Sequence, residues 1–182
     1  MIRLFTALEI PGDIAERLSR LQHGLPGARW IERDAFHLTL CFIGEVTEPV
    51  AGEIDQALSR IEAAPFDVQL HGIGEFGHKK PHAIWAGVNE SPALHALQAE
   101  QETLLRRLRL DIETRKYIAH VTLARTSRVD PSAVGRFIEA NNLFETLPFP
   151  VTRFVLFSAR LSQGGGPYVA ERVYPLDGAD AE

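Results

Sequence analysis

Two short stretches of the sequence, His37-Leu38-Thr39-Leu40 and His120-Val121-Thr122-Leu123, share the pattern His-x-Thr-Leu. Each lies within a mostly apolar run, residues 36–43 and 117–124, that predicts a β-strand. Because side chains alternate faces along a strand, each histidine projects together with the threonine two positions later. The aliphatic residues project to the other face. Each predicted strand therefore presents an imidazole beside a hydroxyl on one face and is anchored in the core through the other.

Around these two stretches, strands and helices alternate without a regular order. Further strands are expected over residues 2–10, 66–70, 83–88, 151–158 and 168–174. Helices are expected to begin near the capping candidates Asp13, Thr47, Ser91 and Asp130. Because the order is not that of a doubly wound sheet, the pattern favours an α+β fold with largely antiparallel pairing.

The composition is that of an ordinary globular protein, with 45% hydrophobic and 24% charged residues in a chain of 182. The length, together with the lack of a long linker, predicts one domain over residues 1–182, with a frayed acidic tail at 177–182. The formal net charge of −5 excludes binding to nucleic acid through bulk positive charge. A local basic cleft is still compatible with this charge.

The remaining compositional features concern compartment and cysteine chemistry. No apolar run approaches the roughly 20 residues of a membrane span, so we expect a cytoplasmic protein that does not enter a membrane. Cys41 is the only cysteine, which excludes an intramolecular disulfide and a cysteine-based zinc site. Its neighbours Leu40 and Phe42 predict a buried, unreactive thiol.

Two histidines and two threonines on strands suit one kind of chemistry. Histidine exchanges a proton near neutral pH, so two can act as base and acid in one reaction. Threonine hydroxyls donate hydrogen bonds that position and polarise phosphate oxygens. Such a set suits in-line displacement at a phosphodiester, and we expect neither a metal nor a cofactor. A single histidine on a strand is more often structural, but the repeated pattern favours a shared site.

A glycine-rich stretch, residues 72–77, matches the pattern G-x-G-x-x-G of dinucleotide-binding loops. Such a loop leads into a helix, whereas Lys79-Lys80-Pro81 leads directly into the next predicted strand. We therefore interpret the stretch as a connection between two strands. His71, His78 and His82 lie nearby, but no carboxylate joins them convincingly, and no metal site is predicted.

The paired His-x-Thr-x motifs, about half a chain apart, resemble those of the two-histidine phosphoesterase superfamily. The similarity is to its bacterial and archaeal RNA 2′,3′-cyclic phosphodiesterases, also called the 2′-5′ RNA ligase family. Residues 3–7 resemble the family's first strand, residues 84–87 its central strand, and residues 115–125 and 156–176 its second motif and final hairpin. Ala119 departs from the proline that commonly precedes the second histidine, which affects backbone rigidity more than chemistry.

The resemblance implies two lobes related by pseudo-twofold symmetry, with helices outside and the motif strands lining a central cleft. It implies hydrolysis of RNA 2′,3′-cyclic phosphate ends to 2′-phosphomonoesters. His120 would be the general base (proton acceptor) and His37 the general acid (proton donor), while Thr39 and Thr122 would hold the phosphate. The family is also associated with ATP-independent 2′-5′ ligation of RNA, and base and acid exchange in the reverse direction.

Three further residues are candidate substrate contacts. Arg125 lies at the family's position for a phosphate-contacting arginine. Strict alternation places it on the face opposite His120, so this role requires a bulge after Leu123, and a surface arginine is the alternative. Phe42 and Tyr168 are candidates for contacting a terminal base through their aromatic faces, although core packing explains Phe42 equally well.

Two other functions stay open at the level of sequence. One is a phosphodiesterase that acts on small cyclic nucleotide phosphates, and the other is a non-catalytic RNA-binding module with the same fold. The intact histidines and threonines favour catalysis. We expect a monomer whose partners are RNA ends bearing a cyclic phosphate or the small nucleotides, and whose positive potential is confined to the cleft around His37 and His120.

Overall fold

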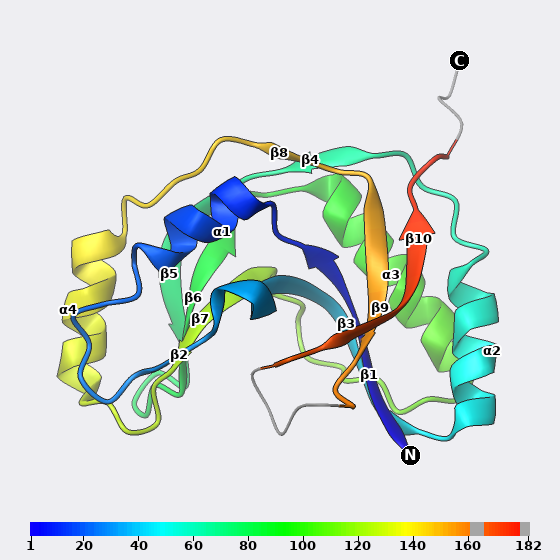
Figure 1. Ribbon diagram of the computed structural model, residues 1–182, viewed down its shortest axis with the longest axis horizontal. Coiled ribbons are helices and arrows are strands. Elements are labelled where there is room, and N and C mark those ends of the chain that lie inside the picture. The colour runs from blue at the N-terminus through cyan, green and yellow to red at the C-terminus, as the bar shows by residue number, and fades with distance from the viewer. Residues whose placement is uncertain (161–165, 179–182) are drawn as a thin grey trace.

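The computed structural model describes residues 1–160 and 166–178. Its strands are β1 (Ile2–Glu9), β2 (Arg29–Trp30), β3 (His37–Val46), β4 (Phe66–Val68), β5 (Leu70–Phe76), β6 (Ala83–Val88), β7 (His120–Arg125), β8 (Phe149–Val151), β9 (Arg153–Ser158) and β10 (Val169–Pro175). Eight of them form one sheet in the order β10-β9-β1-β3-β7-β6-β5, with β2 beside β7 (Figure 1). Strands β4 and β8 form a separate pair. All pairings of these strands are antiparallel.

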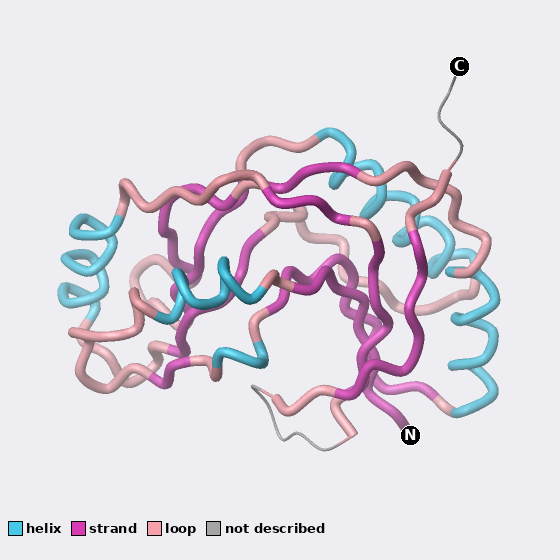
Figure 2. The backbone as a smooth tube through the Cα atoms, turned by 45° about the horizontal axis from the view of Figure 1, so that its top comes forward, coloured by secondary structure: helices cyan, strands magenta, loops and turns pink. Residues whose placement is uncertain are grey.

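The helices of the described residues are α1 (Gly12–Ser19), α2 (Glu48–Leu58), α3 (Pro92–Arg107) and α4 (Pro131–Asn141), with a 3-10 turn at Arg33–Ala35. Helix α3 packs against α2 and against β3 in the middle of the sheet, whereas α4 packs against β5 at one end of the sheet. Figure 1 shows α2 and α3 on one side and α4 on the other, and the rotated view of Figure 2 keeps them at the periphery. The motif strands β3 and β7 lie next to each other in the middle of the sheet.

The sheet divides at its middle, where β3 and β7 pair only through Leu38 and Val121. We call β10, β9, β1 and β3 with α2 and α3 the first lobe, and β7, β6 and β5 with α4 the second lobe. Each motif strand is the inner strand of its lobe. The arrangement confirms the predicted α+β class with largely antiparallel pairing.

The predicted helix starts have different outcomes. Ser91 caps α3, because its Oγ accepts a hydrogen bond from the Leu94 N–H at 3.3 Å. Helix α1 instead begins directly after Pro11 and has no side-chain cap, so the predicted capping role of Asp13 is wrong. Proline already has the φ that the entry to a helix needs, which makes a side-chain cap dispensable there.

The glycine-rich stretch at residues 72–77 belongs almost entirely to β5, so its interpretation as a connection between strands is wrong. In the pairing of β5 with β6, Gly74 lies opposite Trp85. A Cβ on Gly74 would be 2.4 Å from the indole Cη2, so only glycine leaves room for the ring. The stretch therefore accommodates an aromatic side chain. Because glycine has no side chain, its glycines hide the alternating pattern by which a strand is recognised in the sequence.

Three smaller expectations can be compared with the structure. Cys41 is buried, and burial raises the pKa of its thiol to about 12, as expected for an unreactive cysteine. The acidic tail is held at its start, where Gly178 N donates to Ala63 O at 3.1 Å, and residues 179–182 lie outside the described part. Within the described residues, no helix is both long and apolar enough to cross a membrane.

Candidate active site

A cavity of about 370 Å³ is lined by residues of both lobes. His37, Thr39, His120 and Thr122 all line it, so the structure brings the four motif residues together in one cleft. The volume lies within the range of pockets that bind small molecules.

The register of β3 and β7 explains why the four side chains meet. Leu38 lies directly opposite Val121 in the antiparallel pair, and both are fully buried. One step along each strand, each histidine comes opposite the threonine of the other motif, on the alternate face. The two motifs are therefore related by an approximate twofold axis that passes between Leu38 and Val121.

Both imidazoles are oriented by the same kind of hydrogen bond. The Nδ1 of His37 lies 2.8 Å from Ala35 O, and the Nδ1 of His120 lies 2.7 Å from Ile118 O. A carbonyl oxygen can only accept, so Nδ1 carries the proton in each ring. Each Nε2 is therefore the atom left to exchange a proton.

Each histidine also packs against two aromatic rings. The rings are Phe5 and Tyr168 at His37, and Phe76 and Trp85 at His120, with centroids between 4.8 Å and 5.8 Å from the imidazole centroids. The sequence predicts none of the four as a neighbour of a histidine. The rings replace water around the imidazoles, and this has a direct electrostatic effect.

Burial lowers the pKa of both imidazoles below the usual 6.5, because the apolar surroundings disfavour the charged form. The bond to the backbone carbonyl acts in the opposite direction and does not offset burial. At His37, the charges of His120 and Arg125 lower the pKa further. The lowered pKa favours the neutral form of both imidazoles in the free protein, and an anion bound between them would raise both pKa values.

Arg125 faces the cleft because β7 contains a bulge. The register of β7 against β6 shifts between Thr122 and Ala124, which leaves Leu123 as an extra residue. The extra residue reverses the alternation of faces, and Arg125 lines the cavity with the motif residues. Because strict alternation turns Arg125 away from His120, Arg125 can reach a phosphate only if the strand is irregular near Leu123, and the structure has such a bulge. The contact between Arg125 and a phosphate stays a prediction.

Phe42 reaches the cleft in the same way. The register of β1 against β3 shifts between Thr39 and Cys41, which leaves Leu40 as the extra residue. Phe42 lines the cavity and is 50% exposed, so it is not a core residue. Phe42 and Arg125 each lie five positions after the histidine of their own motif. They are equivalent positions of the two lobes.

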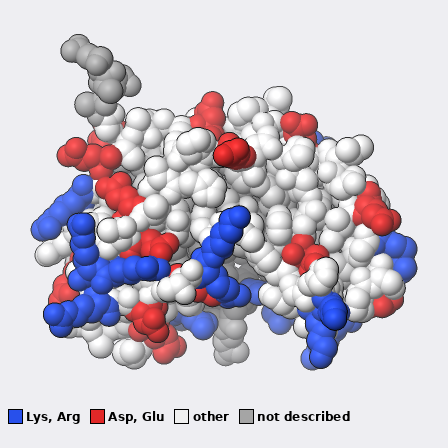
Figure 3. Space-filling view, turned by 180° about the vertical axis from the view of Figure 1, so that it is seen from behind, with Lys and Arg blue, Asp and Glu red and all other residues white. Residues whose placement is uncertain are grey.

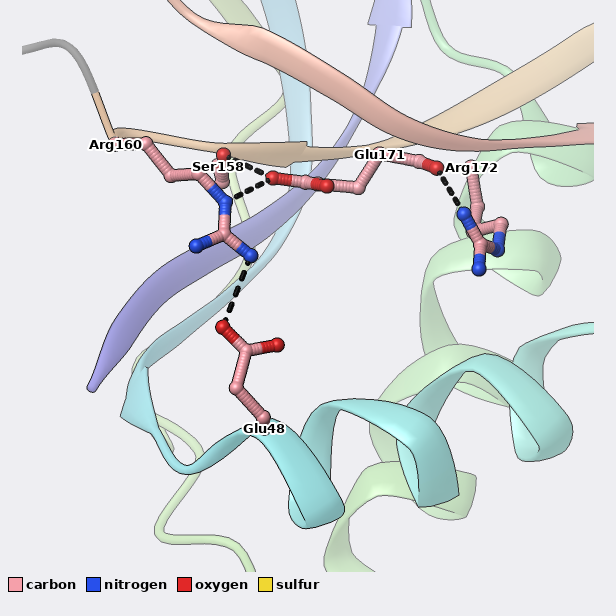
Figure 4. A network of polar contacts seen from close by, with 5 residues as sticks. All are labelled: Glu48, Ser158, Arg160, Glu171 and Arg172. Atoms are coloured by element: carbon pink, nitrogen blue, oxygen red, sulfur yellow. Dashed lines mark hydrogen bonds and ion pairs between the residues drawn. The ribbon is translucent and has the colours of Figure 1, made fainter.

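Tyr168 enters the cleft from the chain that precedes β10. Just after β9, Arg160 donates to Glu171 of β10 at 2.7 Å and to Glu48 of α2 at 3.1 Å (Figure 4). Ser158 donates to the same Glu171 oxygen at 2.6 Å, and the bonds from Ser158 and Arg160 lower the pKa of that carboxyl. This network ties β9 and β10, the strand that directly follows Tyr168, to α2.

Arg3, Phe5, Phe76 and His82 also line the cavity, although the sequence does not predict them as site residues. Arg3, Phe5 and Phe76 come from strands β1 and β5, and His82 directly precedes β6. The place of these strands beside the motif strands is set by long-range pairing, which a single sequence does not reveal. Only in β1 does the sequence itself indicate that two of these residues share a face. There, Arg3 and Phe5 stand two positions apart and therefore face the same side.

The charge lining the cleft is positive. Arg3 and Arg125 line it, and no Asp or Glu among the described residues does. The face opposite that of Figure 1 has acidic and basic side chains, with Arg and Lys also gathered towards its lower corners (Figure 3). The cleft thus has basic and no acidic lining residues among those described, whereas this face carries both signs; that the positive potential is confined to the cleft stays a prediction.

The fold and the paired motifs define a class of phosphoesterase, and comparison with known families agrees. The family model of the 2′-5′ RNA ligase superfamily matches residues 10–162, and the chain belongs to this superfamily. The RNA 2′,3′-cyclic phosphodiesterase of Aeropyrum pernix is 38% identical over 117 residues, which are 63% of this chain and 66% of that protein, just under two thirds of its length. The RNA 2′,3′-cyclic phosphodiesterase of Archaeoglobus fulgidus is 30% identical over 134 residues, 71% of this chain and 76% of that protein.

Solved structures agree with the fold. The crystal structure of TT0787 from Thermus thermophilus superposes with a TM-score of 0.82 over 98% of this chain and 100% of that chain. The sequence identity is 23%, so the likeness concerns the architecture. It supports the overall arrangement of strands and helices described above.

Proposed function

We propose that this chain hydrolyses RNA 2′,3′-cyclic phosphate ends to 2′-phosphomonoesters without a metal ion. The observation that carries the proposal is that both histidines of one cleft bind a backbone carbonyl oxygen through Nδ1. The Nε2 atom of each ring is therefore available for proton transfer. One imidazole can accept a proton while the other donates one across a phosphorus atom. The curated relatives named RNA 2′,3′-cyclic phosphodiesterase support the substrate class.

In the proposed reaction, His120 Nε2 accepts a proton from a water molecule as the water oxygen bonds to phosphorus. The bond between phosphorus and the 3′ oxygen breaks, and His37 donates its Nε2 proton to that oxygen. The phosphate stays on the 2′ oxygen. His120 ends protonated and His37 neutral, and proton exchange with solvent restores the starting pair.

His37 must carry a proton at the start, although burial lowers its pKa in the free protein. The anionic cyclic phosphate supplies the needed stabilisation, because a negative charge within about 4–6 Å favours the protonated imidazole. Thr39 and Thr122 donate hydrogen bonds to the non-bridging oxygens, and Arg125 neutralises the charge that builds on them.

The same displacement joins two RNA ends when a 5′ hydroxyl replaces water as the nucleophile. The product is a 2′-5′ phosphodiester, and no ATP is needed because one phosphodiester bond is exchanged for another. In the reverse direction His37 is the base and His120 the acid. We propose ligation as a secondary reaction of the same site.

The test is to incubate the protein with an oligonucleotide ending in a 2′,3′-cyclic phosphate, in the presence of EDTA, and to identify the product. We expect a 2′-phosphomonoester, formed at a rate that chelation does not change. His37→Ala and His120→Ala should each abolish most of the turnover, because each removes one proton transfer.

His23→Ala is the matched control, since His23 is a histidine that does not line the cleft. It should retain the wild-type rate. A 3′-phosphomonoester product, inhibition by EDTA, or unchanged turnover in both cleft variants would overturn the proposal. Tight RNA binding without any turnover would instead favour a binding module.

A further inference from the structure

A second arginine of the cleft, Arg3, has no part in the proposed reaction. Its guanidinium carbon lies 5.7 Å from the centre of the Phe42 ring, in a cation–π arrangement. Among the described residues no carboxylate forms an ion pair with Arg3, and this includes Glu45, its register partner across β1 and β3. Other arginines, such as Arg153 and Arg160, are paired with carboxylates. Arg3 is thus positioned over a ring with its charge unneutralised.

Arg3 and Arg125 hold different places relative to the histidines. Arg125 is the arginine whose charge lowers the pKa of His37. Arg3 stands two positions before Phe5, whose ring centroid is 5.0 Å from that of His37. Two residues advance a strand by about 7 Å, so Arg3 lies one strand repeat beyond the ring that contacts His37. Arg125 is therefore the arginine placed to bind the reacting phosphate, and Arg3 is placed to bind a neighbouring anion.

The cleft has space for more than a phosphate group. Its volume of about 370 Å³ lies in the range of pockets, roughly 300–1,000 Å³, that hold a whole small molecule. Phe42 contributes an exposed ring at the same end of the cleft as Arg3. An arginine beside an exposed aromatic ring suits a nucleotide unit, because the guanidinium binds phosphate oxygens and the ring contacts a base or ribose.

We propose that Arg3 and Phe42 form a subsite for the phosphodiester on the 5′ side of the terminal nucleotide. This proposal rests on the proposed function and refines its substrate class. The 5′ phosphodiester is present in an RNA chain and absent from a nucleoside 2′,3′-cyclic phosphate. The protein is therefore selective for RNA chain ends over small cyclic nucleotides, although its net charge is negative.

The test compares kcat/KM for uridine 2′,3′-cyclic phosphate with that for the dinucleotide UpU ending in the same cyclic phosphate. One charge-assisted contact predicts at least a ~10-fold preference for the dinucleotide, expressed mainly in KM. Arg3→Gln should lower this preference at least about 5-fold. A dinucleotide with an uncharged methylphosphonate linkage should lose the preference with the wild-type protein and should show no further loss with Arg3→Gln.

Arg107→Gln is the matched control, because Arg107 is exposed on α3 and forms no ion pair among the described residues. It should keep the wild-type preference. The subsite is overturned if Arg3→Gln leaves the preference unchanged, or if it lowers kcat/KM equally for all three substrates. If the wild-type protein hydrolyses none of them, the proposed function has failed separately. In that case, calorimetry measures the Kd of UpU 2′-phosphate and of uridine 2′-phosphate for the wild type and for Arg3→Gln. The subsite is supported if the wild type prefers the dinucleotide at least ~10-fold and Arg3→Gln lowers this preference at least about 5-fold, and it is overturned if the preference is unchanged.

Discussion

The motif strands of the two lobes, β3 and β7, follow the same plan until one position. Each has a histidine, a threonine two residues later, a bulge, and then a side chain that returns to the cleft. In the first lobe that side chain is Phe42, and in the second it is Arg125. In the proposed reaction, the shared part of the motif serves proton transfer and phosphate binding, and the position after the bulge gives each lobe a different further contact.

The cation that the first motif strand lacks is supplied by the neighbouring strand. Arg3 of β1 lies over Phe42, so the first lobe presents a cation on an aromatic ring, whereas the second presents a cation alone. The proposed division of labour follows from this difference. The second lobe neutralises the reacting phosphate, and the first lobe binds the rest of the nucleotide chain.

The largest expected effect is the loss of kcat when either histidine is replaced, and a substrate that needs only one of the two proton transfers distinguishes their roles. On an RNA cyclic phosphate, His37→Ala and His120→Ala should each lower kcat by ~10²–10⁴-fold. A nitrophenyl phosphodiester has a leaving group that needs no proton. On this substrate His37→Ala should lose less than ~10-fold, whereas His120→Ala should keep its full loss. Steady-state rates on both substrates provide the measurement.

The outcome assigns the roles. Rescue of His120→Ala in place of His37→Ala would exchange base and acid between the lobes. Equal losses of each variant on both substrates would show that neither histidine protonates the leaving oxygen. Circular dichroism of the variants serves as the control that both remain folded.

The second comparison uses the equivalent positions after the bulges. Arg125→Gln should lower kcat by about 10²-fold, because it removes a donor that stabilises charge in the transition state. Phe42→Ala should raise KM by about 5- to 100-fold, because it removes a ring contact made in the bound state as well. Kinetic constants on a cyclic-phosphate oligonucleotide separate the two effects. If both variants changed the same constant, the lobes would not be divided between chemistry and binding.

The elements and the motif residues can be predicted from the sequence because they depend on local pattern. Alternation identifies the faces of β3 and β7, and a capping serine locates the start of α3. The same alternation leads to the requirement for a bulge before Arg125. Alternation does not explain the exposure of Phe42, which depends on a second bulge at Leu40. Nothing in the sequence indicates that bulge.

The surroundings of the histidines could not be predicted, because they depend on strand register. Phe76 and Trp85 reach His120 only through the pairing of β5, β6 and β7. Gly74 has a purpose only opposite Trp85, and by itself it indicates a turn or a loop as readily as a strand. Long-range pairing therefore sets the electrostatic environment of a site whose reactive residues are each recognised from a short sequence motif.

A third prediction concerns this glycine. Gly74→Ala should lower the free energy of unfolding by about 1–3 kcal/mol, because the new methyl group overlaps the Trp85 ring. The displaced ring should also disturb His120 and lower activity. Gly52→Ala is the control, since its Cβ meets nothing within 4 Å and should raise helix stability by about 0.5–1 kcal/mol. Urea unfolding measures both, and equal stability of the two variants would contradict the packing of Trp85 over Gly74.

The fourth prediction uses the lowered pKa values of both lobes. Turnover needs one neutral and one protonated imidazole, so kcat/KM should follow a bell-shaped pH profile that reports the free protein. Because burial lowers both pKa values below 6.5, the maximum should lie below pH 6.5. Above it, kcat/KM should fall about tenfold per pH unit as the proton of the acid is lost. A maximum above about pH 7 would contradict the desolvation of the histidines.

The smallest effect should separate the two lobes by their aromatic neighbours. Tyr168→Ala opens one side of His37 to water, and this should raise the pKa of His37 towards 6.5 because hydration stabilises the imidazolium. The pKa of His120 should change little, and Tyr168→Phe, which keeps the ring, should leave both unchanged. NMR titration of the imidazole Cε1–H protons measures each pKa. An unchanged His37 in Tyr168→Ala would show that Phe5 alone excludes water there, and the β9–β10 pair would then not contribute to the difference between the lobes.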